Sequence, residues 1–177
     1  MEERRVRPAP DEHLEYYSRY IDLVPDGDIV ETLDRQLEET RALLASVPTD
    51  REEYRYTEGK WSIREVVGHL IDTERVFAFR ALWFARAAPD PQPGMEQDDW
   101  AAISGDGVRP LADLVEEWAA LRRSNVLMLA GFAAPAWSRR GRASGAELSV
   151  RAAVWIIAGH ERHHRTGLVR DYGLGAG

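Results

Sequence analysis

Four long segments of this sequence carry apolar residues at helical spacing, and helix breakers separate them. They comprise residues 29–47, 62–87, 111–132 and 149–172. In the first segment Ile29, Leu33 and Leu37 recur every four residues, and Pro48 ends the pattern. Strand-like alternation does not persist, although residues 137–149 are compatible with a short hairpin. The pattern predicts an all-α protein, a four-helix bundle with long loops between helices 2 and 3 and between helices 3 and 4.

Polar residues mark where these helices are expected to begin. Asp28 and Ser149 each precede a helical segment, and both residue types are preferred N-caps. Ser62 and Glu65 have the spacing of a capping box. The long segments therefore have defined start points as well as the right periodicity.

Length and composition restrict the classes of protein to be considered. The chain has 177 residues, 44% of them hydrophobic and 30% charged, and a formal net charge of −7. We expect a disordered N-terminus over residues 1–10 and a single domain over residues 11–177. The acidic balance argues against a nucleic-acid partner, and no apolar run approaches the roughly 20 residues that a membrane span requires. With no signal-peptide pattern, a cytoplasmic protein is expected.

Three of the five histidines lie within five residues, in the stretch His160-Glu161-Arg162-His163-His164. His160 and His164 are one helical turn apart on the more apolar face of the fourth helix, whereas His163 points outward. Two imidazoles at this spacing can share one metal ion. Because the chain has no cysteine, that ion would be one that accepts imidazole, carboxylate and water ligands: Zn²⁺, Ni²⁺, Fe²⁺ or Mn²⁺.

A third ligand must come from a facing helix. His13 lies in a segment expected to be mobile, so His69 on the second helix is the better candidate. This predicts a metal site of His69, His160 and His164 with open positions for water or substrate. The alternative is that the His160–His164 pair is a surface or hydrogen-bonded feature without a metal.

Two motif matches in the same stretch are rejected. Residues 160–164 spell the H-E-x-x-H string of zinc proteases, but the longer motif needs a third histidine where the chain has Arg170. Glu161 and His164 also match half of a di-iron bundle site, and the second Glu-x-x-His is missing. Neither a zinc protease nor a di-iron protein is therefore expected.

Four stretches, in order along residues 16–172, carry a resemblance to a known family. They are residues 20–25 (YIDLVP), 60–75 (KWSIREVVGHLIDTER), 96–100 (EQDDW) and 158–164 (AGHERHH). On these stretches the chain resembles the DinB-like family of four-helix-bundle metalloproteins. The resemblance implies a divalent metal held by one histidine of the second helix and an H-x-x-x-H pair of the fourth. These positions are His69, His160 and His164 here.

The resemblance also implies a class of function. Related bundles include transferases that use a low-molecular-weight thiol, such as bacillithiol or mycothiol, and metal-dependent hydrolases. It implies a homodimeric metalloenzyme, either a small-thiol-dependent S-transferase or a hydrolase, with a small-molecule substrate. The alternative is a non-catalytic binding or stress-response bundle that keeps the metal only for stability.

Charged residues near these motifs are further candidates for the site. Glu74, one turn from Leu70 on the apolar stripe, and Glu161 are candidates for a general base or for orienting a metal ligand. The alternative for Glu74 is a buried ion pair with an arginine. The arginines before the fourth helix are candidates for binding the carboxylates of an anionic thiol cofactor, and the alternative is a scattered basic surface. They are Arg139, Arg140 and Arg142.

Overall fold

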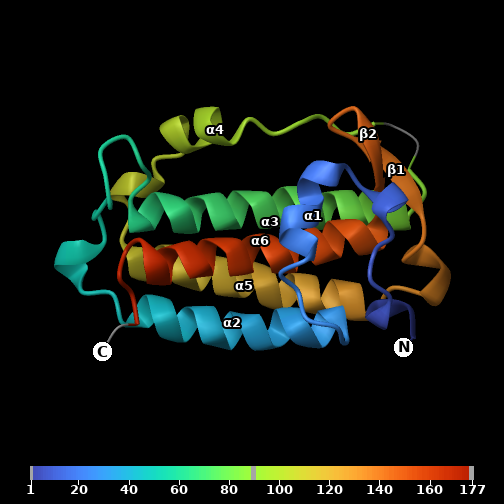
Figure 1. The fold of residues 1–177 in the computed structure, drawn as a ribbon, viewed down its shortest axis with the longest axis horizontal. Coiled ribbons are helices and arrows are strands. Elements are labelled where there is room, and N and C mark those ends of the chain that lie inside the picture. The colour runs from blue at the N-terminus through green and yellow to red at the C-terminus, as the bar shows by residue number, and fades with distance from the viewer. Residues whose placement is uncertain (1, 89–90, 176–177) are drawn as a thin grey trace.

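Four long helices form the body of the molecule in the computed structural model, which describes residues 2–88 and 91–175 (Figure 1). They are α2 (Ile29–Ala45), α3 (Ile63–Ala85), α5 (Leu111–Ala130) and α6 (Val150–Arg170). α6 packs against α3 and α2, and α5 packs against the other faces of α3 and α2. The predicted four-helix bundle is confirmed.

The helices begin where the polar residues predict. The Asp28 carboxylate accepts a hydrogen bond from the Val30 backbone N–H at 3.0 Å, which caps α2. At the start of α3, the Ser62 N–H donates to the Glu65 carboxylate at 2.6 Å and the Glu65 N–H donates to the Ser62 hydroxyl at 3.3 Å. The Ser149 hydroxyl accepts from a backbone N–H of α6. Local sequence thus fixes three of the four starts.

The helix α6 is the centre of the bundle. Residues 150–161 are all buried, because other elements cover every side of this part of the helix. Most of them are small or branched apolar residues, and Trp155 is 1% exposed. The polar exceptions are Arg151, His160 and Glu161. A buried polar side chain costs free energy unless it has a partner, so these residues require specific contacts.

Shorter elements occupy the connections. Helix α1 (Ser18–Ile21) lies against α6, and α4 (Gln97–Ile103) lies beside α3 (Figure 1). Strands β1 (Arg140–Ala143) and β2 (Ala146–Ser149) form an antiparallel hairpin. Short 3-10 helices span Glu2–Arg5, Pro10–Glu12, Glu15–Tyr17, Thr49–Arg51, Asp106–Val108 and Ala134–Ala136. The hairpin lies within residues 137–149, as the sequence allows, whereas α4 falls in a segment predicted to be a loop.

The sequence predicts disorder for residues 1–10, and the described part of this segment contacts the bundle. The Arg7 guanidinium donates to the Ile21 carbonyl at 2.9 Å and to the Val24 carbonyl at 2.7 Å. It also lies 4.6 Å from the centre of the Trp155 ring. These partners are distant in sequence, so composition alone does not reveal them.

Some positions named in the sequence analysis lie outside the residues that the structure describes. Pro89, one of the prolines of the predicted loop between the second and third helices, is not described, nor are Met1 and Gly177 at the ends of the predicted segments. No described helix combines the length and apolar character that a membrane crossing requires.

Candidate metal centre

The structure brings His69, His160 and His164 together, and we call them the histidine cluster. His69 lies on α3, and the other two lie one turn apart on α6, so the packing of α3 on α6 forms the cluster. His163 is exposed, as predicted from the helical face. His13 is not part of the cluster, and its Nδ1 lies 2.9 Å from the Leu14 carbonyl.

The three imidazoles point the same kind of atom at a common centre. Nε2 of His160 lies 2.9 Å from Nε2 of His69 and 3.1 Å from Nε2 of His164. Ligands about 2.0–2.1 Å from a tetrahedral zinc ion would be about 3.3 Å apart. The two nitrogen pairs that include His160 are therefore spaced almost as ligands of a single small ion would be, and the ligand atoms of all three histidines lie within 4.8 Å of one another.

Hydrogen bonding alone does not satisfy this arrangement. Each imidazole nitrogen presents either one N–H or one in-plane lone pair. Nε2 of His160 has two nitrogen neighbours within contact distance, so a hydrogen bond can satisfy only one of these contacts. A divalent cation at the centre would use all three lone pairs at once, and three neutral nitrogen donors suit Zn²⁺, Ni²⁺ or Fe²⁺.

Burial keeps the imidazoles of the cluster neutral. Desolvation lowers the pKa of His69 to about 4 and that of His164 to about 3. The pKa of His160 is also lowered well below its ordinary value, by burial first and then by the neighbouring histidines. At neutral pH all three therefore keep the lone pairs that a metal ligand needs.

Aromatic rings hold the imidazoles in place. The Trp61 ring lies 4.7 Å from the His69 ring and 6.5 Å from the His164 ring, measured between centroids. The rings of Tyr20 and His160 meet in a T-shaped arrangement with their centroids 5.3 Å apart. Burial raises the pKa of Tyr20 above its ordinary value, so its hydroxyl stays protonated at neutral pH.

Two cavities meet the cluster from different sides. One of about 500 Å³ is bounded by α1, α3, α6, the start of α4 and the residues just before it, and His69 and His160 line it. We call it the α3 cavity. The other, of about 640 Å³, is lined by His164, Trp61 and the end of α6. A molecule of substrate size can therefore reach the cluster, as a catalytic metal site requires.

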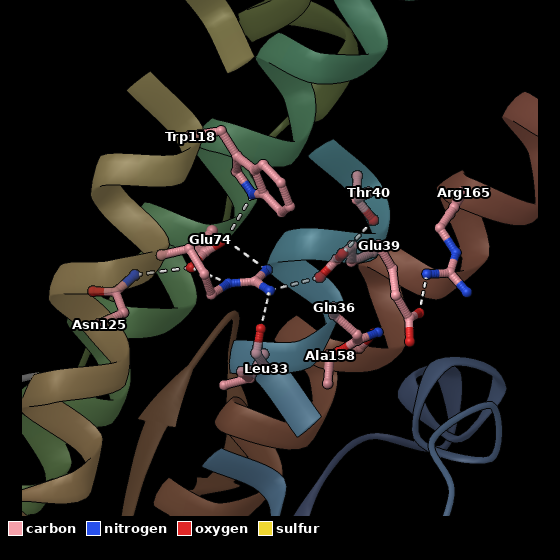
Figure 2. A network of polar contacts seen from close by, with 11 residues as sticks. Leu33, Gln36, Glu39, Thr40, Glu74, Trp118, Asn125, Ala158 and Arg165 are labelled. Atoms are coloured by element: carbon pink, nitrogen blue, oxygen red, sulfur yellow. Dashed lines mark hydrogen bonds and ion pairs between the residues drawn. The ribbon is translucent and has the colours of Figure 1, made fainter. Parts of the chain in front are cut away.

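A buried network of charged groups lies beside His160 (Figure 2). Arg122 of α5 is 1% exposed and donates two hydrogen bonds of 2.8 Å to Glu74 and one of 2.7 Å to Glu161. Trp118 and Asn125 also donate to Glu74, and Thr40 donates to Glu161. Arg122 also donates to the Leu33 carbonyl of α2, so one arginine binds two buried carboxylates on α3 and α6 and joins all four long helices.

The contacts of Glu74 are those of a buried ion pair, the alternative that the sequence left open. Burial raises the pKa of Glu161, although the charge of Arg122 opposes this shift. Burial also works against the charge of Arg122, but Glu161 and Glu74 outweigh it and raise the pKa of the guanidinium. Neither carboxylate lines the α3 cavity.

The three arginines proposed as cofactor ligands do not line the α3 cavity either. Their contacts are Arg139 to the Ala85 carbonyl, Arg140 to Asp11 and Glu147, and Arg142 to the Gly145 carbonyl. Their positions depend on how the hairpin packs on the bundle, which sequence spacing does not determine.

Two residues that the sequence analysis missed do line the α3 cavity. They are Thr73 and Arg80, both on α3 and each 3% exposed. The signal for Arg80 was present, because it follows Phe77 and precedes Ala81 and Phe84 on the apolar face of the helix. A charged residue at a buried helical position requires an explanation.

The sequence was compared with protein families and with curated proteins. The sequence family described as the DinB superfamily matches residues 32–166. No curated protein matches the sequence significantly.

Two solved structures share the fold of this chain. One is YfiT from Bacillus subtilis, which is described as "a probable metal-dependent hydrolase with an unusual four-helix bundle topology". It is 16% identical to this chain with a TM-score of 0.66, and the alignment covers 96% of this chain and 94% of YfiT. A mycothiol-dependent maleylpyruvate isomerase has 12% identity and a TM-score of 0.69 over 88% of this chain. The match spans only 63% of the isomerase. At these identities the likeness concerns the fold.

Proposed function

The chain belongs to the DinB superfamily, and from this premise we propose that it is a metal-dependent enzyme acting on a small molecule. The proposal places a divalent ion on His69, His160 and His164. One observation carries it: ligand nitrogen atoms of three neutral histidines lie within 4.8 Å of one another beside a cavity of about 500 Å³. A structural site would have no need of such a cavity.

A divalent ion at the cluster would supply positive charge that lowers the pKa of a bound water or thiol and so provides a nucleophile at neutral pH. The protein's own residues would do the rest. Phe77 and Ile156 line the cavity and exclude water from one side of a substrate. Tyr20, protonated and in contact with His160, would donate a hydrogen bond to an anionic group near the cluster.

We propose small-thiol-dependent transfer as the reaction. Glu74 and Glu161 are bound to Arg122, so neither is positioned to remove a proton from water. Transfer from a thiol makes less demand on such a base, because thiols ionise far more readily than water. The mycothiol dependence of the isomerase with the same fold supports this choice. We propose that Glu74 and Glu161 hold α6 and the His160 backbone in position.

Hydrolysis is the second candidate, and a different observation favours it. Glu96, just before α4, and Asp98 and Asp99 at the start of α4 also line the α3 cavity. An exposed carboxylate there could accept a proton from water, and YfiT is described as a probable hydrolase.

The test uses protein reconstituted with Zn²⁺, Ni²⁺ or Mn²⁺ and compares two reactions. One is transfer of a small thiol to an electrophilic aromatic halide, and the other is hydrolysis of a nitrophenyl ester. We expect thiol transfer that is lost in His160→Ala and kept in His13→Ala. Ester hydrolysis with the same dependence would select the second candidate. A metal that only raises the melting temperature, with no turnover of either kind, would select the non-catalytic bundle.

We also propose that the protein works as a homodimer in the cytoplasm. The family resemblance supports the dimer. The lack of a signal-peptide pattern in the sequence supports the location. Light scattering after size exclusion should give twice the chain mass of 20.0 kDa. A mass of one chain would refute the dimer and leave the metal site unaffected.

A further inference from the structure

Four residues of α3 that line the α3 cavity share one face of the helix. His69, Thr73, Phe77 and Arg80 follow each other at intervals of four, four and three residues. At 1.5 Å per residue, the Cα atoms of His69 and Arg80 are about 16 Å apart along the helix. The cavity is therefore long, with the histidine cluster near one end and a guanidinium near the other.

Arg80 is a buried cation without a carboxylate partner among the described residues. Its Nη2 donates to the Pro93 carbonyl at 2.7 Å and to the Ser144 hydroxyl at 3.2 Å. The guanidinium also lies 4.9 Å from the centre of the Phe77 ring. These contacts, together with a side-chain hydrogen bond to Tyr17, are all neutral, so none of the described residues compensates the charge of Arg80, which is costly at a buried position.

Thr73 provides a second unsatisfied group between the two ends. Its hydroxyl oxygen is buried and has no hydrogen-bond partner among the residues that the structure describes. An unpaired buried hydroxyl costs free energy that a ligand in the cavity would recover. The lining of the cavity thus contains, on the same face of α3, a hydroxyl without a hydrogen-bond partner and a cation without a carboxylate partner among the described residues.

We propose that the α3 cavity binds an elongated small-molecule carboxylate, with its carboxylate on Arg80 and its reacting end at the histidine cluster. A single guanidinium matches the one charge of a carboxylate, whereas a phosphate dianion would require more cations. The planar edge of the guanidinium also fits a carboxylate. This inference rests on the proposed function for the identity of the reacting end, and it identifies the substrate class.

The acidic residues that also line the cavity do not prevent this binding. Glu96, Asp98 and Asp99 have exposed side chains, so water and salt screen their charges. Arg80 is buried, and its interaction with an anion is correspondingly stronger. The buried charge of Arg80 therefore determines that the cavity prefers an anionic ligand.

The test uses Co²⁺-substituted protein and pairs of thiols that differ only at the far end. Mercaptopropionate, mercaptohexanoate and mercaptoundecanoate are compared with the mercapto-alcohols of the same chain length. Thiol binding is measured from the sulfur-to-cobalt absorption band, which does not depend on turnover. For the chain length that spans the cavity, we expect the carboxylate to bind at least about tenfold more tightly than the alcohol.

Variants then locate the carboxylate. The quantity compared is the affinity for the mercapto-carboxylate divided by the affinity for the mercapto-alcohol of the same length. In Arg80→Gln this ratio should fall to about one while the affinity for the mercapto-alcohol stays unchanged. Arg80→Lys should keep part of the ratio. Arg123→Gln removes an exposed arginine of α5 and should keep all of it. A ratio that survives in Arg80→Gln but disappears in Arg142→Gln would place the anion on the hairpin and overturn the inference.

The two proposals can fail separately. If cobalt binds and accepts thiols but the wild-type ratio is near one at every chain length, the inference is overturned and the proposed function stands. This wild-type measurement decides the question even if Arg80→Gln does not fold. If cobalt does not bind, the proposed function fails, and calorimetry with hexanoate against hexanol then tests Arg80 in the metal-free protein.

Discussion

Replacing Arg122 with methionine should destabilise the protein by about 3–5 kcal/mol at neutral pH. The guanidinium donates to Glu74 twice, to Glu161 once and to the Leu33 carbonyl once. Methionine has a similar length, so the lost volume is small and the cost comes from the two carboxylates left buried without their cation. Total stabilities of about 5–15 kcal/mol are usual, so this loss is a large part of the whole.

The loss should depend on pH in one direction. Burial already raises the pKa of Glu161 from 4.5, and removing Arg122 removes the charge that opposes this shift. A carboxyl whose pKa is higher in the folded state than in the unfolded state destabilises the fold when it is ionised. This penalty disappears as the pH falls through the folded-state pKa. The variant should therefore lose less stability, relative to wild type, at pH 5 than at pH 8.

Urea denaturation followed by circular dichroism measures both effects. Arg123→Met is the matched control, because Arg123 is the next residue and pairs with Glu116 at the surface. We expect the control to change stability by no more than about 0.5 kcal/mol. If Arg122→Met does not fold at all, adding Glu74→Gln and Glu161→Gln should restore folding. A loss below about 1 kcal/mol, or one that does not change with pH, would refute the argument.

Three further predictions concern stability. A Cβ at Gly159 would overlap the Tyr20 carbonyl oxygen, so Gly159→Ala should lower the free energy of unfolding by about 1–3 kcal/mol. Gly167 lies on the same helix and has room for a Cβ, so Gly167→Ala should raise the free energy of unfolding by up to about 1 kcal/mol. The same urea denaturation assay measures both changes. Asp28→Ala removes the N-cap of α2 and should lower the melting temperature, at a cost of about 1–2 kcal/mol. The metal-free protein should lose stability as the pH falls from 6.5 toward about 4, because the unfolded chain takes up protons that buried His69 does not. A metal-free melting temperature that stays constant or rises over that pH range would contradict this.

Much of the fold follows from local sequence. Periodicity predicts the four long helices, and Asp28, Ser62 and Ser149 act as the N-caps that their residue types favour. These signals lie within a few residues of the structure they determine. The helix α4 has seven residues and follows a proline-rich segment, so its pattern is too short to be distinguished from a loop.

Helical spacing predicts that His160 and His164 share a face, and His69 could be added because a third ligand must come from a facing helix and because the family resemblance names that position. Helical spacing also places Arg122 on the buried stripe of α5, four residues after Trp118. It predicts a buried residue there, although an arginine is usually expected at the surface. The partners of Arg122 and Arg80 come from other elements, so spacing does not identify them. Long-range packing decides these contacts, and it also positions the hairpin arginines.

The central claim is that the histidine cluster binds one divalent metal ion per chain. Elemental analysis of protein purified without a histidine tag and reconstituted with Zn²⁺ tests it most directly. We expect about one metal ion per chain in wild type and in the His13→Ala, His163→Ala double variant, and none in the folded His69→Ala, His160→Ala double variant. Wild-type protein without metal after reconstitution, or metal retained by the His69→Ala, His160→Ala protein, would contradict the account.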